Sequence, residues 1–182
     1  MKFLKKRINA WIITILIIVL STVISGGSSL NKIRQQTMDI FYLGEDMDGA
    51  GIQHDLNMIM SDSANLTVVA GRYLSKDHEL IQKVLNDRDA LNEAETPAEK
   101  YDATQKLLSS VTELYTYLGD LSLSEKDQNF RNNLYANINS HNIKISRNSY
   151  NKYAKEFNSL LNTFPANILS KLAFISPVEP YE

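Results

Sequence analysis

The acidic side chains of residues 45–55 are the first group in the sequence whose types could bind a metal ion. A calcium-binding loop that started at Asp46 would place Asp48 at its third position and Gly51 at its sixth. The same register puts Ala50 at the fifth position and Asn57 at the twelfth, where a bidentate glutamate is required. The pattern therefore favours a solvated turn before a helix, with divalent-ion binding as the lesser alternative.

Histidine and cysteine give little support to catalysis. His54, His78 and His141 are far apart in sequence, none lies in a His-Glu-x-x-His frame, and they are predicted to be surface or capping residues. The chain has no cysteine, which excludes thiolate zinc sites, iron–sulfur clusters and cysteine nucleophiles. It also has no phosphate-binding glycine loop and no Gly-x-Ser-x-Gly elbow. The sequence therefore predicts a protein that is not an enzyme and holds no cofactor.

The amino-terminal part of the sequence has the pattern of a membrane anchor. Basic residues occupy much of residues 1–7, and no charged side chain follows from Ile8 to Asn31. A membrane-spanning helix needs roughly 17–25 mainly apolar residues, so residues 8–26 are predicted to be a transmembrane anchor. The four cations before this segment favour a cytoplasmic amino terminus at residues 1–7 and a chain that continues outside the cytoplasm. A signal peptide cleaved near Gly26 fits the same pattern and stays open as an alternative.

The remaining sequence is predicted to be helical. Apolar and small side chains recur at steps of three and four residues, which places them on one helix face. The first such face comprises Ile52, Leu56, Ile59, Ser63, Leu66, Ala70 and Tyr73. A later one comprises Tyr101, Thr104, Leu108, Val111, Tyr115 and Leu118.

Two helix starts are specified by capping residues. Thr96, Pro97 and Glu99 give a hydroxyl N-cap, a proline at the first helical position and a glutamate three residues after the cap. Ser124 is the next predicted cap, and no proline or glycine interrupts the sequence from there until Pro165. The pattern thus predicts a final helix of up to forty residues.

The predicted fold class is all-α: an N-terminal transmembrane helix followed by an antiparallel bundle of about four long helices. The bundle is assigned to residues 29–175 and a C-terminal tail to residues 176–182. Residues 29–43 are expected to be either its first helix or a continuation of the anchor. Net charge is -2, which gives no reason to expect nucleic acid as a partner.

The last third of the chain resembles the LemA family. Arg147 precedes Tyr150 and Asn151, Phe157 and Asn158 follow seven residues later, and the run ends at Phe164 and Pro165. Earlier matches to the family spacing are Tyr73, after Asn65 and Leu66, and Arg88, after Val84. The sequence departs from the family pattern at Asp62, Ala64, His141 and Asn142. Asn151 and Asn158 are themselves predicted to fix helix register by hydrogen bonding across a helix seam.

The resemblance implies a single-pass membrane protein with a long antiparallel helical bundle and no known cofactor. We therefore expect a non-enzymatic scaffold or interaction domain at the cell envelope, with the lipid bilayer and membrane proteins as partners and the bundle outside the cytoplasm. Two alternatives are a ligand-sensing bundle that acts through a partner membrane protein and a secreted bundle released by signal-peptide cleavage. The cations chosen as candidate partner contacts are Lys144, Arg147, Lys152 and Lys155.

Overall fold

The computed structural model describes residues 7–182, and every regular element in that range is an α-helix. The elements in chain order are α1 (Arg7–Leu43), α2 (Ile52–Ala70), α3 (Glu79–Glu93), α4 (Pro97–Gly119), α5 (Glu125–Ser146), α6 (Tyr150–Leu160) and α7 (Ala166–Leu172). Residues 7–182 contain no strand, so the predicted all-α class is confirmed. Apart from Arg7, the predicted cytoplasmic segment at residues 1–7 lies outside the described residues.

The chain divides into two compact units. The first unit contains Met1–Met38 and Tyr153–Val178, and the second contains Asp39–Lys152 and Glu179–Glu182. Helices α1 and α6 each begin in one unit and end in the other.

Helix α1 is a single helix of 37 residues, so residues 29–43 continue the apolar segment instead of starting a new helix. It is long and apolar enough to cross a membrane, and none of its most apolar 18-residue window is buried. The large aliphatic side chains from Ile8 to Ile24 are mostly more than half exposed. The apolar amino-terminal helix predicted from the sequence is confirmed, as a candidate membrane anchor.

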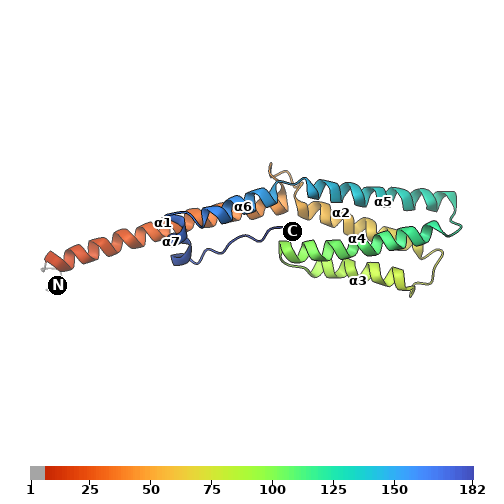
Figure 1. Cartoon of the computed structure of the whole chain (residues 1–182), viewed down its shortest axis with the longest axis horizontal. Helices are drawn as coiled ribbons and strands as arrows, with labels where there is room; N and C mark the ends of the chain where they lie inside the picture. The colour runs from red at the N-terminus through yellow and green to blue at the C-terminus, as the bar shows by residue number, and fades with distance from the viewer. Residues whose placement is uncertain (1–6) are drawn as a thin grey trace. The chain divides into compact units, whose positions relative to one another are not determined.

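In the second unit, helix α2 packs against both α5 and α3, while α3 also packs against α4 (Figure 1). Six of the seven residues predicted to form the inner face of α2, from Ile52 to Ala70, are buried. Tyr73 lies three residues beyond the end of this helix. The periodicity therefore predicted the buried side of α2 correctly and its end approximately.

Helix α4 begins as its sequence predicts. The Thr96 hydroxyl accepts a hydrogen bond from Glu99 N, the Glu99 carboxylate accepts one from Thr96 N, and Pro97 is the first helical residue. The predicted inner face is partly wrong, because Leu107 and Leu114 are fully buried in place of Leu108 and Tyr115. Tyr115 instead stacks on Tyr135 of α5, with ring centroids 3.9 Å apart. An amphipathic tyrosine fits such a half-exposed helix contact.

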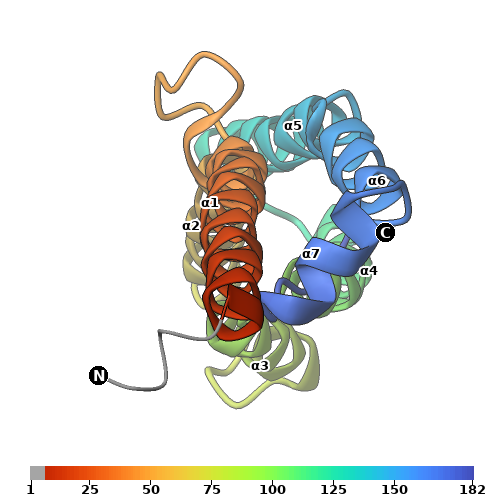
Figure 2. The ribbon, with the colours of Figure 1, turned by 90° about the vertical axis from the view of Figure 1, so that its left-hand side faces the viewer.

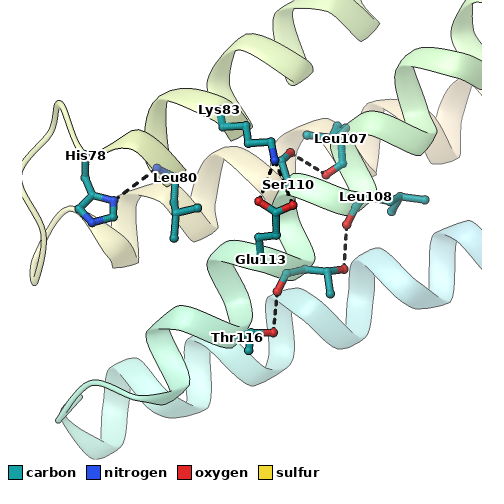
Figure 3. A network of polar contacts seen from close by, with 9 residues as sticks. His78, Leu80, Lys83, Leu107, Leu108, Ser110, Glu113 and Thr116 are labelled. Carbon is teal, nitrogen blue, oxygen red and sulfur yellow. Dashed lines mark hydrogen bonds and ion pairs between the residues drawn. The ribbon is translucent and has the colours of Figure 1, made fainter.

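A polar contact between two exposed side chains joins α3 and α4 (Figure 3). Lys83 Nζ donates to both carboxylate oxygens of Glu113, at 3.0 and 2.7 Å. His78 is the N-cap of α3 and accepts a hydrogen bond from Leu80 N, at 3.3 Å (Figure 3). The prediction of a capping role is therefore confirmed for this histidine.

The long final helix predicted from Ser124 to Pro165 is wrong, because the chain leaves the helical path between α5 and α6. Arg147 is the C-cap of α5, and Asn148 Oδ1 accepts a hydrogen bond from Tyr150 N at 2.9 Å. Ser149 donates its hydroxyl proton to Glu45, at 2.7 Å. Asparagine and serine side chains compete with the helix for backbone partners in this way, so a break needs neither proline nor glycine.

In the first unit, α7 lies directly against α1 (Figure 2). A Cβ atom added at Gly26 would be 2.7 Å from a Leu169 methyl carbon, and one added at Gly27 would be 2.5 Å from the Ala173 Cβ. Arg34 of α1 also donates to the backbone oxygen of Ser176, at 3.1 Å. The two glycines thus allow a close approach that any larger residue would obstruct.

Candidate functional site

The candidate site is formed by the C-terminal tail and the side chains that hold it. Residues 175–182 contain no helix, yet Val178 is 1% exposed and Tyr181 is 7% exposed. Burial of a non-helical segment requires partners for its backbone N–H and C=O groups, because an unpaired buried amide is costly. Asparagines of α6 supply them.

In the first unit, Asn158 binds the backbone of Val178 at two points. Its Nδ2 donates to the Val178 oxygen at 2.8 Å, and its Oδ1 accepts from the Val178 nitrogen at 2.9 Å. One side-chain amide thus pairs with both the N–H and the C=O group of a residue, as a neighbouring β-strand would do. Both hydrogen bonds go to backbone atoms of Val178, so they do not depend on the type of its side chain.

In the second unit, Asn151 makes the same pair of contacts with Tyr181. Its Nδ2 donates to the Tyr181 oxygen and its Oδ1 accepts from the Tyr181 nitrogen, each at 2.8 Å. Tyr150, which is fully buried, donates its hydroxyl proton to the Glu179 oxygen at 2.5 Å. Both asparagines bind the non-helical tail and not a second helix, so the predicted partner across a helix seam is wrong.

The two asparagines make the same kind of contact, each within its own unit. We refer to Asn151 and Asn158 as the asparagine pair.

The side chain of Tyr181 fills an aromatic cluster in the second unit. Its ring lies 5.3 Å from the Tyr101 ring and 6.0 Å from the Phe41 ring, and Phe41 lies 5.1 Å from Tyr150. Burial raises the pKa of the Tyr181 hydroxyl to about 12. The tail is therefore held by its side chains as well as by its backbone.

Tyr73 connects the end of α2 to the start of α5. Its hydroxyl donates to Asp127 Oδ2 at 2.6 Å and accepts from Ser124 N at 2.9 Å, and Arg72 forms an ion pair with the same carboxylate. Asp127 is buried, and the pKa of its carboxyl lies below the ordinary value. The largest cause is the hydrogen bond from Tyr73, and the hydrogen bond from Ser124 and the positive charge of Arg72 lower the pKa further.

The acidic side chains of residues 45–55 contact protein groups. Asp48 accepts a hydrogen bond from Ala50 N at 2.9 Å, and Asp55 lies 2.7 Å from the Nδ1 atom of His141. Gly44 and Gly49 adopt left-handed conformations, with φ of 86° and 85°, that turn the chain into α2. Within residues 7–182, no group of three or more metal-ligating side chains is close enough to hold an ion. His141 is thus neither a surface nor a capping histidine.

The remaining predicted site residues differ widely in environment. Phe157 is 2% exposed, Arg88 pairs with its neighbour Asp89 at 2.7 Å, and Phe164 is 80% exposed next to Pro165. The four candidate partner-binding cations are all exposed and come from α5, its C-cap and α6: Lys144, Arg147, Lys152 and Lys155.

Sequence reasoning missed the role of the tail. Asparagines seven residues apart on a helix were visible, and so were Val178 and Tyr181 three residues apart near the end of the chain. The sequence did not show which tail residues these asparagines bind, because the tail has no periodicity of its own.

Fold and site together define a class: an all-helical protein with an apolar amino-terminal helix and a C-terminal tail held by asparagines of its penultimate helix. The model of the LemA family matches residues 50–182, nearly three quarters of the chain, and the chain belongs to the LemA family. The match includes the asparagine pair, Tyr73 and the tail. A comparison with curated proteins finds no match.

Proposed function

We propose that this chain is a non-enzymatic, single-pass membrane protein that presents a helical interaction domain at the cell envelope, outside the cytoplasm. The observation that carries the proposal is the exposed apolar surface of α1, where Ile12, Ile15 and Ile18 are each more than half exposed. An apolar surface of this extent is unfavourable in water, and the hydrocarbon core of a bilayer would bury it along a helix of this length. Membership of the LemA family is consistent with it.

The test is protease shielding on intact cells with a tag after Glu182, together with mass analysis of the mature amino terminus. An outward-facing anchored protein loses the tag while Met1 or Lys2 remains on a membrane-bound fragment. A protected tag would place the helical domain in the cytoplasm and contradict the proposed topology. A mature chain that begins near Gly26 would replace the anchored protein with the released, secreted form.

We also propose that α2, α3, α4 and α5 run antiparallel. Contacts between α2 and α5 support this arrangement, because Asp55 pairs with His141 whereas Tyr73, later in the chain, pairs with the earlier Asp127. The three-residue connection between α3 and α4 also suits antiparallel neighbours. Spin labels at Asn57 and Asn139 are then expected to be close, whereas labels at Asn57 and Gln128 are expected to be far apart. The reverse order of distances would contradict the arrangement.

The protein partner is proposed to contact the basic residues around the turn between α5 and α6. Lys144 and Arg147 are exposed at the end of α5. Their combined replacement, Lys144→Glu with Arg147→Glu, is expected to abolish crosslinking to envelope proteins, since charge reversal repels an acidic surface. Lys106→Glu with Lys126→Glu, an equal charge change on exposed positions of α4 and α5, is the control. Equal crosslinking of both variants and the unaltered chain would contradict this surface.

A further inference from the structure

Several apolar side chains in and around α7 are exposed in the structure. Phe174 is 89% exposed and Phe164 is 80% exposed, while Ile168 and Leu172 on α7 itself are about half exposed. Phe174 also has a left-handed backbone conformation, with φ of 55°, which a bulky residue rarely adopts. Both phenylalanines are thus far more exposed than Phe41 and Phe157, which are 0% and 2% exposed.

The position of α7 on α1 indicates what covers these side chains. Helix α7 touches α1 at Gly26 and Gly27, through Leu169 and Ala173. If the membrane-embedded part of α1 begins at Ile8, about 20 helical residues cover the bilayer core of about 30 Å. Gly27 is the twentieth residue from Ile8, counting both, so the contact with α7 falls at the boundary of the hydrocarbon region.

The charge pattern of this part of the chain suits the same location. Lys171 is the only charged side chain in residues 157–178, just as no charge occurs on α1 from Ile8 to Asn31. A lysine next to apolar side chains can place its stem along the acyl chains and its ammonium group among the lipid phosphates. A carboxylate would instead be repelled by anionic lipid, and the segment has none.

We propose that residues 164–174 form a second membrane contact, which lies in the bilayer interface beside the point where α1 leaves the membrane. Phe164, Ile168, Leu172 and Phe174 insert among the lipid chains. The occupant of this apolar surface is thus the lipid bilayer that α1 crosses, and this inference rests on the proposed membrane anchor. The close contact at the two glycines fixes the depth of the second contact relative to the first.

The absence of native cysteine permits a direct test with single-cysteine variants of the full chain. Fluorescent NBD labels are placed one at a time at Phe174, Ile168, Ile15 and Met47, in vesicles of phosphatidylcholine and phosphatidylglycerol. All four native side chains are at least half exposed, so the labels disturb no packed core. Iodide in the water and nitroxide groups on the lipids then report which side each label faces.

Labels at Phe174 and Ile168 are expected to lose most of their iodide quenching and to be quenched best by nitroxides near the lipid headgroup. Ile15 is expected to respond to nitroxides deep in the acyl chains, and Met47 to iodide alone. If Ile15 is embedded while Phe174 and Ile168 respond to iodide as Met47 does, the second membrane contact is wrong and the anchor holds. If Ile15 itself responds to iodide, the anchor is wrong and the inference fails with it.

A charge variant gives an independent readout. Ile168→Glu with Leu172→Glu is expected to expose the Phe174 label to iodide while the far-ultraviolet circular dichroism stays unchanged, because a carboxylate is expelled from anionic lipid. Ile168→Ser with Leu172→Ser, with no added charge, is the matched control and is expected to expose the label less. A Phe174 label that stays shielded in the glutamate variant would overturn the proposal.

Discussion

At the scale of single residues, the asparagine pair shows how a short polar side chain can replace a β-strand neighbour. Asn158 and Asn151 each satisfy one N–H and one C=O group of the tail. A hydrogen bond of this kind contributes about 1 kcal/mol net, so each asparagine is expected to contribute about 2 kcal/mol to holding the tail. The asparagines therefore give the tail an ordered path without a sheet.

Asn158→Asp keeps the acceptor oxygen but places a second oxygen against the Val178 carbonyl. Loss of the donor and the new repulsion are expected to speed hydrogen exchange of the Val178 amide by about 30-fold, which corresponds to roughly 2 kcal/mol of local opening. Asn151→Asp is expected to do the same at Tyr181. The measurement is amide exchange resolved to single residues.

Asn162→Asp is the matched control for both variants. Asn162 is exposed, and its side-chain amide donates to the Asn158 backbone oxygen one turn earlier. Its replacement is expected to leave exchange at Val178 and Tyr181 unchanged. Equal exchange in all three variants would show that the tail is held by its side chains alone.

Tyr181 predicts a loss of stability in alkali. The unfolded hydroxyl has a pKa of about 10, whereas burial raises the pKa in the folded chain to about 12. Between these values the unfolded state releases its proton and the folded state keeps it, so the free energy of unfolding falls as pH rises from about 10 to about 12, by up to roughly 2–3 kcal/mol. Urea unfolding at pH 8 and pH 11.5 measures this loss.

Tyr181→Phe keeps the ring in the aromatic cluster and removes the ionising group. This variant is expected to lose less stability than the unaltered chain between pH 8 and pH 11.5. Tyr117→Phe, at a more exposed tyrosine of α4, is the control and is expected to behave as the unaltered chain. An identical alkaline loss in all three proteins would contradict a buried Tyr181 hydroxyl.

At the scale of elements, the ends of helices are set by local side chains, while the buried faces depend on neighbours. The capping box of α4 involves only Thr96 and Glu99, and it forms as predicted. The break between α5 and α6 is also closed locally, by Asn148, but Ser149 adds a contact with the distant Glu45. Local side-chain contacts therefore account fully for the start of α4 and only in part for the break between α5 and α6.

Thr96→Ala removes the N-cap of α4 and leaves the Glu99 N–H without its partner. The expected cost is about 1 kcal/mol of unfolding free energy, measured by chemical denaturation. Thr116→Ala is the control, since Thr116 is exposed inside the same helix and its hydroxyl donates to the Thr112 backbone oxygen one turn earlier. Alanine there is expected to be neutral or slightly stabilising, because it is the better helix former.

At the scale of the whole molecule, α1 belongs to two environments. Its first part has an exposed apolar surface, whereas Gly27, Leu30 and Thr37 are buried in the first unit. One helix therefore serves as candidate membrane anchor and as part of the folded structure. Cleavage near Gly26 would remove the former and retain most of the latter.

Ile17→Arg tests the first of these roles. An arginine at the centre of a spanning helix costs about 2.5–3.5 kcal/mol of insertion free energy. We expect a smaller share of the protein to resist alkaline extraction from membranes, while the protease resistance of the second unit stays unchanged. Ile17→Leu is the control and is expected to extract as the unaltered chain does; equal extraction of the arginine variant would argue against a spanning helix.

The sequence by itself determined the helical class, the apolar amino-terminal helix, the inner face of α2 and the N-caps of α4 and α5, Thr96 and Ser124. Each of these depends on residues within a few turns of one another, through periodicity or capping hydrogen bonds. Only the tertiary structure decided that α4 buries Leu107 and Leu114, that Tyr73 bonds to Asp127, and that the asparagine pair holds the tail. These contacts join residues far apart along the chain, and their partners carry no local pattern that sequence periodicity could detect.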